Sequence, residues 1–457
     1  MAKAKSKYVC QECGYETPKW MGRCPDCGSW NSLVEERVTE PREKKPGRAH
    51  LQPTVGTTRR PEQLTAIESG ASQRIDTGLD ELNRVLGGGL VPGELVLLSG
   101  DPGIGKSTLT MQLLAKMAGE GDVLYVSGEE SKAQIRNRAE RLGVQSARIH
   151  VMTENDVEVL DQVVRGQKWD LLIIDSVQTI FDPAVQSAPG SVSQLRAVTA
   201  VCMGWAKGVG IPTVLIGHVT KDGSVAGPRV LEHMVDAVLL FEGDRQSQYR
   251  VLRGLKNRFG STGEIGVFDM TSEGLVEVGD ASRVFLSERT RSVSGAVVTA
   301  IVEGSRPILV EIQALATKSF YGQSRCMTTG IKYDRVAMLI AVLEKRAGLR
   351  LGDQDVYLNV VGGLRVDDPA CDLAVTMAIA SSFLDQCLPQ NLLLLGEVGL
   401  TGELRQVSQL ERRLREAAQM GFTRAIIPKQ KKRLEIPGME IVEQSLLSDV
   451  MNECWRE

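Results

Sequence analysis

The sequence has few aromatic residues, little net charge and no long apolar run. Aromatic residues make up 4% of its 457 residues and the formal net charge is −3, so no basic field over the whole chain indicates nucleic-acid binding, which would require a local surface. The longest apolar runs, such as LLII and AVLL, are far shorter than a membrane span, and the start MAKAKSKYVC lacks the apolar core of a signal peptide. We therefore expect a cytoplasmic protein with no membrane partner.

Cysteines are too scarce for a disulfide scaffold, but four of the nine lie within the first 27 residues. They form two Cys-x-x-Cys pairs, and Gly14 and Gly28 follow the pairs where a tight turn needs a permissive backbone. Two such knuckles complete a tetrahedron around Zn²⁺, and four sulfur ligands leave no open position, so the predicted site is structural. Redox pairs or unliganded thiols are the alternative. The predicted ligands are Cys10, Cys13, Cys24 and Cys27.

The residues between and after the knuckles leave two questions open. Lys19, Trp20 and Arg23 could form a small basic and aromatic contact surface, or Trp20 and Trp30 could simply pack a knuckle that is too small to have a core. Residues 35–70 are rich in charge, proline and threonine and have no apolar periodicity. This composition indicates a flexible tether, with an extension that docks on a neighbour as the alternative.

A strand, a glycine-rich loop and a helix follow the tether. The run ELVLLSG has the pattern of a buried strand, GDPGIGKS matches G-x-x-x-x-G-K-[ST], and TLTMQLLAKMA continues with helical spacing. In such a P-loop, backbone N–H groups surround the phosphates of ATP, Lys106 reaches the β and γ phosphates, and Ser107 binds Mg²⁺. The predicted ATP-binding residues of this loop are Gly100, Asp101, Pro102, Gly103, Ile104, Gly105, Lys106, Ser107 and Thr108.

Polar residues end the strands that follow. Asp175 comes at the end of the apolar run LLII, the usual place of an aspartate that holds Mg²⁺ through water, and Glu129 and Glu130 come after DVLYVSG. Because the carboxyl ends of parallel strands share one crevice, we expect these glutamates near Asp175, where either could orient the attacking water. An exposed helix start is the alternative for the pair. His218 ends the strand PTVLIG, where it could sense the γ phosphate, although a lone histidine is more often structural.

Two long polar segments could line a channel for a single strand of nucleic acid. FDPAVQSAPGSVSQLR ends in Arg196, and TKDGSVAGPRVLEHMVD carries Lys221 and Arg229. Loops of this kind bind the nucleic-acid backbone more than the bases.

Taken together, the motifs resemble the bacterial RadA (Sms) family of DNA repair proteins, which have a RecA-type ATPase core. The resemblance covers essentially the whole chain and rests on TGLDELNRVLGGGLVPGE, GDPGIGKST, SGEES, LLIIDSVQT, GHVTKDG and the most family-specific piece, KNRFG at residues 256–260. It implies a ring or filament with ATP at subunit interfaces, in which Lys256 and Arg258 act on the neighbour's ATP as an arginine finger does. A solvated strand end, or a role of Lys256 near DNA, is the alternative.

From about residue 283 the chain resembles the Lon protease domain, in VVGGLRVDDPACDLAVTMAIASS and in LGEVGLTGELRQVSQLERRLREAAQMGFTRAIIP. Lon enzymes use a serine within D-G-P-S-A-G and a lysine on a later helix. Here Ala370 occupies the serine position and Glu411 the lysine position, and neither can perform that chemistry. Cys371 lies one residue away, and no histidine follows it. We expect a proteolytically inactive scaffold that serves ring assembly and presents a charged surface.

The expected fold is α/β, with a RecA-like P-loop ATPase core, an N-terminal four-cysteine zinc finger and a C-terminal α+β Lon-protease-like domain. The resemblance implies a DNA-dependent ATPase with ATP, Mg²⁺ and Zn²⁺ as cofactors. It further implies a hexameric ring that moves on single-stranded DNA and promotes branch migration of recombination intermediates with RecA. A slow nucleotide-gated scaffold that binds protein partners is the alternative. The expected finger, linker, ATPase domain and Lon-like domain span residues 1–34, 35–70, 71–282 and 283–457.

Overall fold

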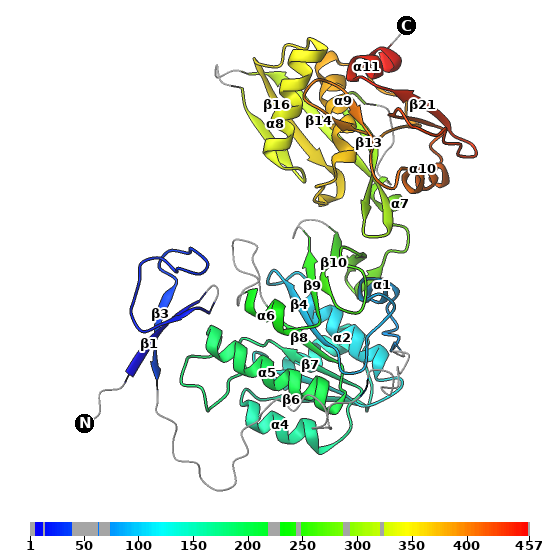
Figure 1. The fold of residues 1–457 in the computed structure, drawn as a ribbon. Helices are drawn as coiled ribbons and strands as arrows, with labels where there is room; N and C mark the ends of the chain where they lie inside the picture. The colour runs from blue at the N-terminus through cyan, green and yellow to red at the C-terminus, as the bar shows by residue number, and fades with distance from the viewer. Residues whose placement is uncertain are drawn as a thin grey trace. The chain divides into compact units, whose positions relative to one another are not determined.

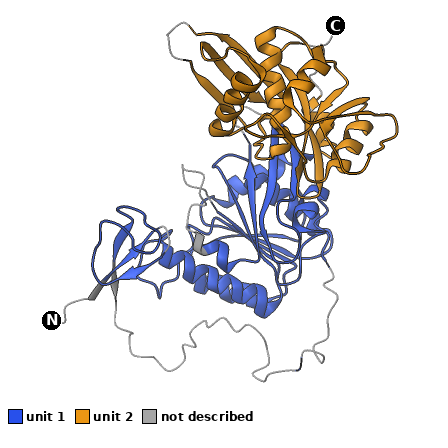
Figure 2. Ribbon diagram, turned by 45° about the horizontal axis from the view of Figure 1, so that its top comes forward, with its two compact units in different colours: residues 1–277 blue, residues 278–457 orange. Residues whose placement is uncertain are grey.

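The computed structural model of the chain contains two compact units (Figure 2), residues 1–277 and residues 278–457. Among the helices that the structure describes, none is both long enough and apolar enough to cross a membrane. The described residues are 5–11, 14–38, 63, 74–217, 229–243, 248–286, 293–319 and 324–455.

The first unit starts with a small antiparallel sheet in the order β2-β1-β3. Tyr8 of the middle strand pairs with Thr17 on one side and with Glu35 on the other. The buried cluster of this sheet is small and includes two of the cysteines. Because so small a core does not stabilise the sheet by itself, a metal ion that cross-links its turns would stabilise it. The strands are β1 (Lys5–Cys10), β2 (Glu16–Thr17) and β3 (Leu33–Val38).

A nine-stranded sheet forms the centre of the first unit, in the order β12-β11-β10-β9-β4-β8-β7-β5-β6. The strands from β9 to β6 in this order are parallel, and β10, β11 and β12 extend the sheet in antiparallel fashion. The strands are β4 (Leu95–Gly100), β5 (Val123–Ser127), β6 (Ile149–Thr153), β7 (Leu171–Asp175), β8 (Thr213–Ile216), β9 (Ala237–Glu242), β10 (Tyr249–Asn257), β11 (Ile265–Thr271) and β12 (Gly274–Glu277).

Helices cover both faces of this sheet (Figure 1). Alternate residues of β4 pack in opposite cores: Val96 and Leu98 with α1 and α2, and Leu95 and Leu97 with α4 and α5. Burial on both faces explains why the sequence of β4 is continuously apolar. The predicted α/β class is confirmed. The helices are α1 (Asp80–Leu86), α2 (Lys106–Met117), α3 (Lys132–Arg141), α4 (Val157–Gly166), α5 (Val192–Val209) and α6 (Arg229–Met234).

The second unit is built on a seven-stranded mixed sheet in the order β15-β16-β14-β13-β17-β20-β21. Its central helix α9 is buried from Asp372 to Ser381 and packs on the hairpin of β13 and β14. The strands of this sheet are β13 (Ala296–Glu303), β14 (Arg306–Lys318), β15 (Cys326–Thr329), β16 (Gln354–Val360), β17 (Leu392–Leu394), β20 (Arg424–Pro428) and β21 (Glu440–Gln444). The other elements are α7 (Ala281–Leu286), α8 (Tyr333–Val342), a π-helical turn (Leu343–Ala347), α9 (Asp372–Leu384), β18 (Glu397–Val398), β19 (Leu404–Arg405), α10 (Leu410–Gln419) and α11 (Leu447–Trp455).

Candidate ATP site and zinc ribbon

The glycine-rich loop starts where β4 ends, at Gly100, and stops where α2 begins, at Lys106. Gly105 has a φ of 115°, in the left-handed region, and a Cβ at this position would lie only 2.6 Å from Met270 Cε. The left-handed backbone disfavours any residue with a side chain here, and the glycine lets the backbone approach a ligand closely. The N–H groups of Thr108 and Leu109 both donate to the carbonyl oxygen of Gly105, and the N–H groups that precede them at the start of α2 make this loop suited to an anion.

Lys106 is buried inside the loop. Its Nζ donates to the carbonyl oxygens of Gly100 at 2.6 Å and of Asp101 at 2.9 Å. Burial lowers the pKa of Lys106, and the charges of Asp175, Asp101 and Glu129 oppose that shift. Because these hydrogen-bond partners are neutral carbonyls, the positive charge of Lys106 is available for a phosphate.

Ser107 and Asp175 meet beside the loop. Ser107 Oγ donates to Asp175 Oδ2 at 2.9 Å, and Asp175 is buried at the end of β7. A serine hydroxyl with a carboxylate hydrogen-bonded beside it fits a Mg²⁺ ion that the serine would bind and that the carboxylate would hold through water. The hydroxyl of Tyr125 donates to the same carboxylate oxygen at 2.5 Å. Burial, and then the charge of Asp175, raises the pKa of Tyr125, so the phenol stays protonated and remains a donor.

Two further residues contact the site and belong to no predicted motif, Tyr125 and Arg250. Tyr125 lies in β5, which pairs with β7. The one indication of its role in the sequence is that a phenol within an apolar strand needs a buried hydrogen-bond partner. Arg250 is buried on β10, and its Nε donates to the carbonyl oxygen of Ile104 in the loop at 3.3 Å. No sequence pattern links two residues that lie so far apart in the chain.

Glu129 and Glu130 lie beside Asp175, as the order of the strands predicts. β5 pairs with β7 in a register that places Ser127 opposite Asp175. The N–H of Gly128 then donates to the carbonyl oxygen of Asp175 at 2.9 Å. The two glutamates that follow are therefore held at the carboxyl end of β7, next to the proposed Mg²⁺ ligands.

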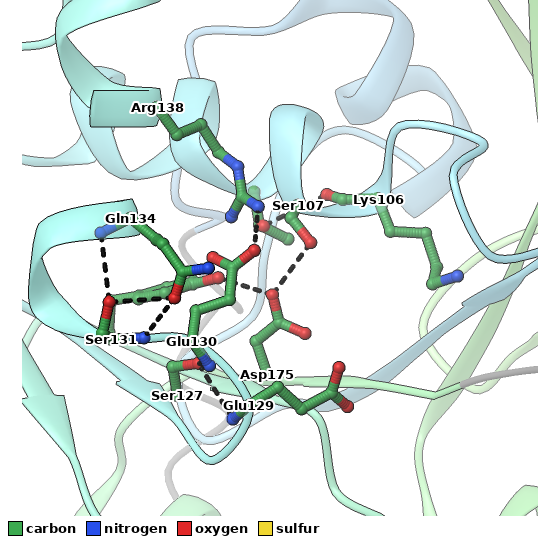
Figure 3. Close-up of polar contacts among 11 residues, drawn as sticks. Lys106, Ser107, Ser127, Glu129, Glu130, Ser131, Gln134, Arg138 and Asp175 are labelled. Carbon is green, nitrogen blue, oxygen red and sulfur yellow. Dashed lines mark hydrogen bonds and ion pairs between the residues drawn. The ribbon is translucent and has the colours of Figure 1, made fainter. Parts of the chain in front are cut away.

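The two glutamate side chains point apart (Figure 3). Glu130 forms an ion pair with Arg138 of α3. Glu129 is exposed, and its Oε1 accepts from Ser176 Oγ at 2.5 Å. The charge of Glu129 also acts on Lys106. Glu130 is therefore paired with a cation of α3, whereas Glu129 lies on the side of Lys106.

The KNRFG segment lies at the other end of the sheet from its own P-loop. Lys256 of β10 is opposite Val238 of β9, and the adjacent Ala237 is opposite Val96, near the start of β4. The P-loop follows the last residue of β4, Gly100. At about 3.3 Å per residue, Val96 and Gly100 are roughly 13 Å apart along the strand. The structure does not bring the two cations to the ATP site of the same chain.

Both cations of the segment have partners within the unit. Lys256 Nζ donates to the carbonyl oxygens of Glu232 and Val235, at 2.5 Å and 2.9 Å, at the end of α6. Arg258 Nη1 lies 3.3 Å from Asp236 Oδ1, and its side chain is 54% exposed. Burial and the charge of Arg258 lower the pKa of Lys256. Arg258 is thus the more accessible of the two.

Several predicted residues fall outside the part of the chain that the structure describes. His218, Lys221 and the zinc ligand Cys13 lie outside the described residues. Arg229 is the first residue of α6, but its side chain is not described either. Their predicted roles stay predictions.

The remaining three cysteines of the N-terminal set converge. The sulfur atoms of Cys10, Cys24 and Cys27 all lie within 4.8 Å of one another, and those of Cys10 and Cys27 are 3.7 Å apart. Sulfur ligands around tetrahedral Zn²⁺ are about 3.8 Å apart, so the set fits zinc. In each knuckle the N–H of the glycine donates to the carbonyl oxygen of the first cysteine: Gly14 to Cys10 at 2.8 Å and Gly28 to Cys24 at 3.0 Å.

Neither tryptophan of this small domain is buried. Trp20 and Trp30 are both exposed, and Arg23 also lies at the surface. The alternative in which the two tryptophans pack the knuckle is therefore wrong. The knuckle turns are instead held by backbone hydrogen bonds and by the cysteine cluster.

The second unit contains the positions that correspond to the catalytic serine and lysine of Lon enzymes. Ala370 is buried in the turn before α9, and Cys371 is buried beside it. Burial raises the pKa of the Cys371 thiol well above its usual value, which disfavours a thiolate. Glu411 is exposed on α10 and pairs with Arg415, one turn on, at 2.6 Å.

Two arginines, the buried Arg413 and the half-buried Arg335, hold the segment around Ala370 together. Arg413 is fully buried, lies 2.7 Å from Asp368 Oδ2 and donates to the carbonyl oxygen of Ala300 at 2.5 Å. Arg335 forms an ion pair with the buried Asp372 at the start of α9. Both arginines are therefore engaged in ion pairs within the second unit.

Comparisons with known proteins decide the family. The "DNA repair protein RadA" of Bacillus subtilis (strain 168) is 50% identical over 454 residues, which cover 98% of this chain and 99% of the relative. The chain belongs to the RadA family. A relative of the same name from Listeria monocytogenes serovar 1/2a is 48% identical over 456 residues, which cover 98% of this chain and 99% of the relative.

Three family models match parts of this RadA-family chain. A model of a rubredoxin metal binding domain matches residues 8–35, an AAA domain matches residues 58–224, and a model of subunit ChlI of Mg-chelatase matches residues 328–431. The central domain is therefore an ATPase domain, and the N-terminal segment is a metal-binding ribbon. A crystal structure of the RadB recombinase is 23% identical and covers 44% of this chain and 99% of its own, with a TM-score of 0.37, which is too low to support an argument.

Proposed function

We propose that this RadA-family chain is a DNA-dependent ATPase of recombinational DNA repair. In this proposal it forms a hexameric ring in the cytoplasm that moves on single-stranded DNA and, with RecA, promotes branch migration and extension of recombination intermediates. The names of the relatives, which align over nearly the whole chain, support the repair role. The AAA domain that contains the P-loop supports the ATPase activity.

The residues of the site have the following roles in the proposed hydrolysis. The N–H groups at the start of α2 and the ammonium of Lys106 bind the phosphates. Ser107 and Asp175 hold Mg²⁺, which neutralises charge on the β and γ phosphates when it is bound. Glu129 orients the attacking water and accepts its proton, because its carboxylate is exposed on the lysine side of Asp175 whereas Glu130 is paired with Arg138.

The proposal of a ring rests on one observation, the position of the KNRFG segment. Lys256 and Arg258 lie beside the start of β4, whereas the P-loop follows its end. An extended arginine side chain does not cover that distance, so these cations cannot stabilise charge on ATP bound to the same chain. In this proposal a neighbouring copy receives them, as a finger that acts in trans would require.

The second unit serves in this proposal as a scaffold and not as a protease. A methyl group at Ala370 cannot attack a carbonyl, and the buried thiol of Cys371 has a raised pKa. Glu411 is engaged with Arg415 at the surface. The sheet and the buried ion pairs of this unit are retained, and they suit an assembly surface.

The test is steady-state ATP hydrolysis by the full chain without DNA, with single-stranded DNA and with duplex DNA, at low and moderate salt. We expect single strands to stimulate the rate several-fold, and Lys106→Ala to abolish hydrolysis because the phosphates lose their cation. A rate that is indifferent to DNA would overturn the proposal in favour of a slow nucleotide-gated scaffold for protein partners.

A further inference from the structure

Two indole rings are exposed on the zinc ribbon without a role in its fold. The side chain of Trp30 is 72% exposed and that of Trp20 is 55% exposed, whereas Trp169 and Trp205 are buried in the ATPase domain. Tryptophan has one of the largest apolar surfaces of any side chain, and leaving it in water stabilises nothing within the domain. Two exposed tryptophans in so small a domain therefore indicate a contact surface.

Both rings lie beside the same glycine. A Cβ at Gly22 would lie 3.7 Å from Trp20 Cη2 and 3.9 Å from Trp30 Cζ3. Trp30 is held in place by the turn of the second knuckle, because it forms an antiparallel bridge with Arg23. The N–H of Asn31 donates to the carbonyl oxygen of Gly22 at 2.8 Å, which closes the same turn. The ribbon thus presents two flat apolar rings from a well-defined backbone.

Two positively charged residues, Arg23 and Lys19, lie near the rings in the sequence. The guanidinium carbon of Arg23 lies 5.8 Å from the centre of the Trp30 ring, and Arg23 Nε donates to the carbonyl oxygen of Gly28 at 2.9 Å. Lys19 is exposed next to Trp20 in the sequence. The two segments that carry the rings, PKWMGR and GSWNS, contain both cations and no acidic residue. The turn between the two segments adds the exposed Asp26, so two cations face one acidic residue between Lys19 and Trp30.

We propose that Lys19, Trp20, Gly22, Arg23 and Trp30 form a stacking platform for single-stranded DNA. Bases stack on the two indoles, and the guanidinium and ammonium groups bind the phosphates between them, because flat aromatic groups interspersed with cations match a chain of alternating bases and phosphates. The proposal rests on the proposed function as a motor on single strands. It adds a DNA contact outside the ATPase domain.

Gly22 allows a test that leaves both rings in place. Its Cβ position makes only ordinary van der Waals contacts, so Gly22→Asp and Gly22→Asn are both accommodated. Asp introduces a negative charge between the indoles, and Asn has nearly the same shape without charge. The platform predicts that Gly22→Asp weakens binding of oligo(dT) by the full chain about tenfold, whereas Gly22→Asn changes it less than about twofold.

Tryptophan fluorescence gives a second readout of the same contact. Stacking of oligo(dT) quenches the emission of exposed indoles, so we expect quenching in the parent chain and its loss in the double variant Trp20→Ala, Trp30→Ala, with binding weakened about tenfold or more. Val34→Ala removes another exposed apolar side chain of the ribbon and is the matched control. Bound zinc reports that each ribbon is folded, and the control Val34→Ala should hydrolyse ATP without DNA at the parent rate.

The outcomes separate this inference from the proposed function. If single strands do not stimulate ATP hydrolysis by the parent chain, the proposed function fails. If they do, but zinc-loaded Trp20→Ala, Trp30→Ala binds oligo(dT) as the parent does, the platform is wrong and the surface faces a protein. If the double variant loses zinc, the Gly22 pair decides, and equal affinities of Gly22→Asp and Gly22→Asn overturn the proposal.

Discussion

Asp236 binds Arg258 and at the same time anchors the strand that leads to the P-loop. Its Oδ1 lies 3.3 Å from Arg258 Nη1, and its Oδ2 accepts from the backbone N–H of Leu95, the first residue of β4, at 3.0 Å. Lys207 of α5 also contacts Oδ2, at 2.6 Å. One buried carboxylate therefore joins the KNRFG segment to the strand whose other end carries the P-loop. The KNRFG segment and the P-loop are thus connected through the same strand.

The first prediction concerns this carboxylate. Asp236→Asn keeps an oxygen for the N–H of Leu95 but removes the charge that orients Arg258, so we expect the DNA-stimulated kcat to fall about tenfold with the KM for ATP nearly unchanged. Steady-state kinetics measure both constants. Glu140→Gln, which breaks an exposed pair with Arg136 on α3, is the control and should have no effect. A changed KM with an unchanged kcat would contradict the positioning role.

The second prediction separates the two glutamates. Glu129→Gln should lower kcat about a hundredfold or more while ATP still binds, because the exposed carboxylate that accepts the proton is lost. Glu130→Gln should lower it far less, because Glu130 is already paired with Arg138. Single-turnover hydrolysis with a separate binding assay measures the two steps. The opposite order of effects would assign the water-orienting role to Glu130.

The third prediction concerns pH and Glu94. This carboxyl is buried at the start of β4, its Oε1 has no hydrogen-bond partner among the described residues, and burial raises its pKa to about 7. The native state therefore holds a proton that the unfolded chain releases near its ordinary pKa of 4.5. The resulting stabilisation is present at low pH and is lost as the pH rises through about 7.

Glu94→Gln is uncharged at every pH and isolates this effect. Between about pH 5 and about pH 8, the free energy of unfolding of the ATPase domain should decrease in the parent by on the order of 3 kcal/mol more than in Glu94→Gln. Urea unfolding followed by tryptophan fluorescence at several pH values measures it. Parallel pH profiles of the two proteins would show that Glu94 is ionised in the native state.

The fourth prediction concerns zinc. The purified chain should contain one zinc ion, and Cys24→Ser should lose it because the remaining sulfur atoms no longer complete a tetrahedron. ATP hydrolysis without DNA should be retained in this variant, since the ATP site is built from the nine-stranded sheet and its own helices. Elemental analysis measures the metal. A zinc-free parent chain with oxidised cysteines would favour redox pairs instead.

Most of the predictions from the sequence came from short local patterns. The P-loop and the cysteine knuckles are each encoded by a few adjacent residues, because a tight turn with defined backbone angles has few solutions. Asp175 and the glutamates were placed together because parallel strands end at one edge of a sheet, which requires only the order of the strands.

What the sequence did not predict depends on neighbours that are distant in the chain. The hydroxyl of Tyr125 reaches Asp175 because β5 pairs with β7, and Arg250 reaches the P-loop because β10 adds to the sheet. Arg138 distinguishes Glu130 from Glu129 only once α3 folds back. Lys256 meets carbonyl oxygens at the end of α6 that no motif marks. Exposure of the two ribbon tryptophans was likewise undecided, since residue type alone does not determine burial.

The most direct measurement is ATP hydrolysis by mixed assemblies of two inactive variants with single-stranded DNA. Lys106→Ala lacks the P-loop cation but has an intact KNRFG segment, and Arg258→Ala has an intact P-loop but lacks the finger. If the finger acts in trans, an equal mixture regains about a quarter of the parent rate, because random assembly pairs an intact loop with an intact finger at one interface in four. A mixture no more active than its separate components would contradict the account.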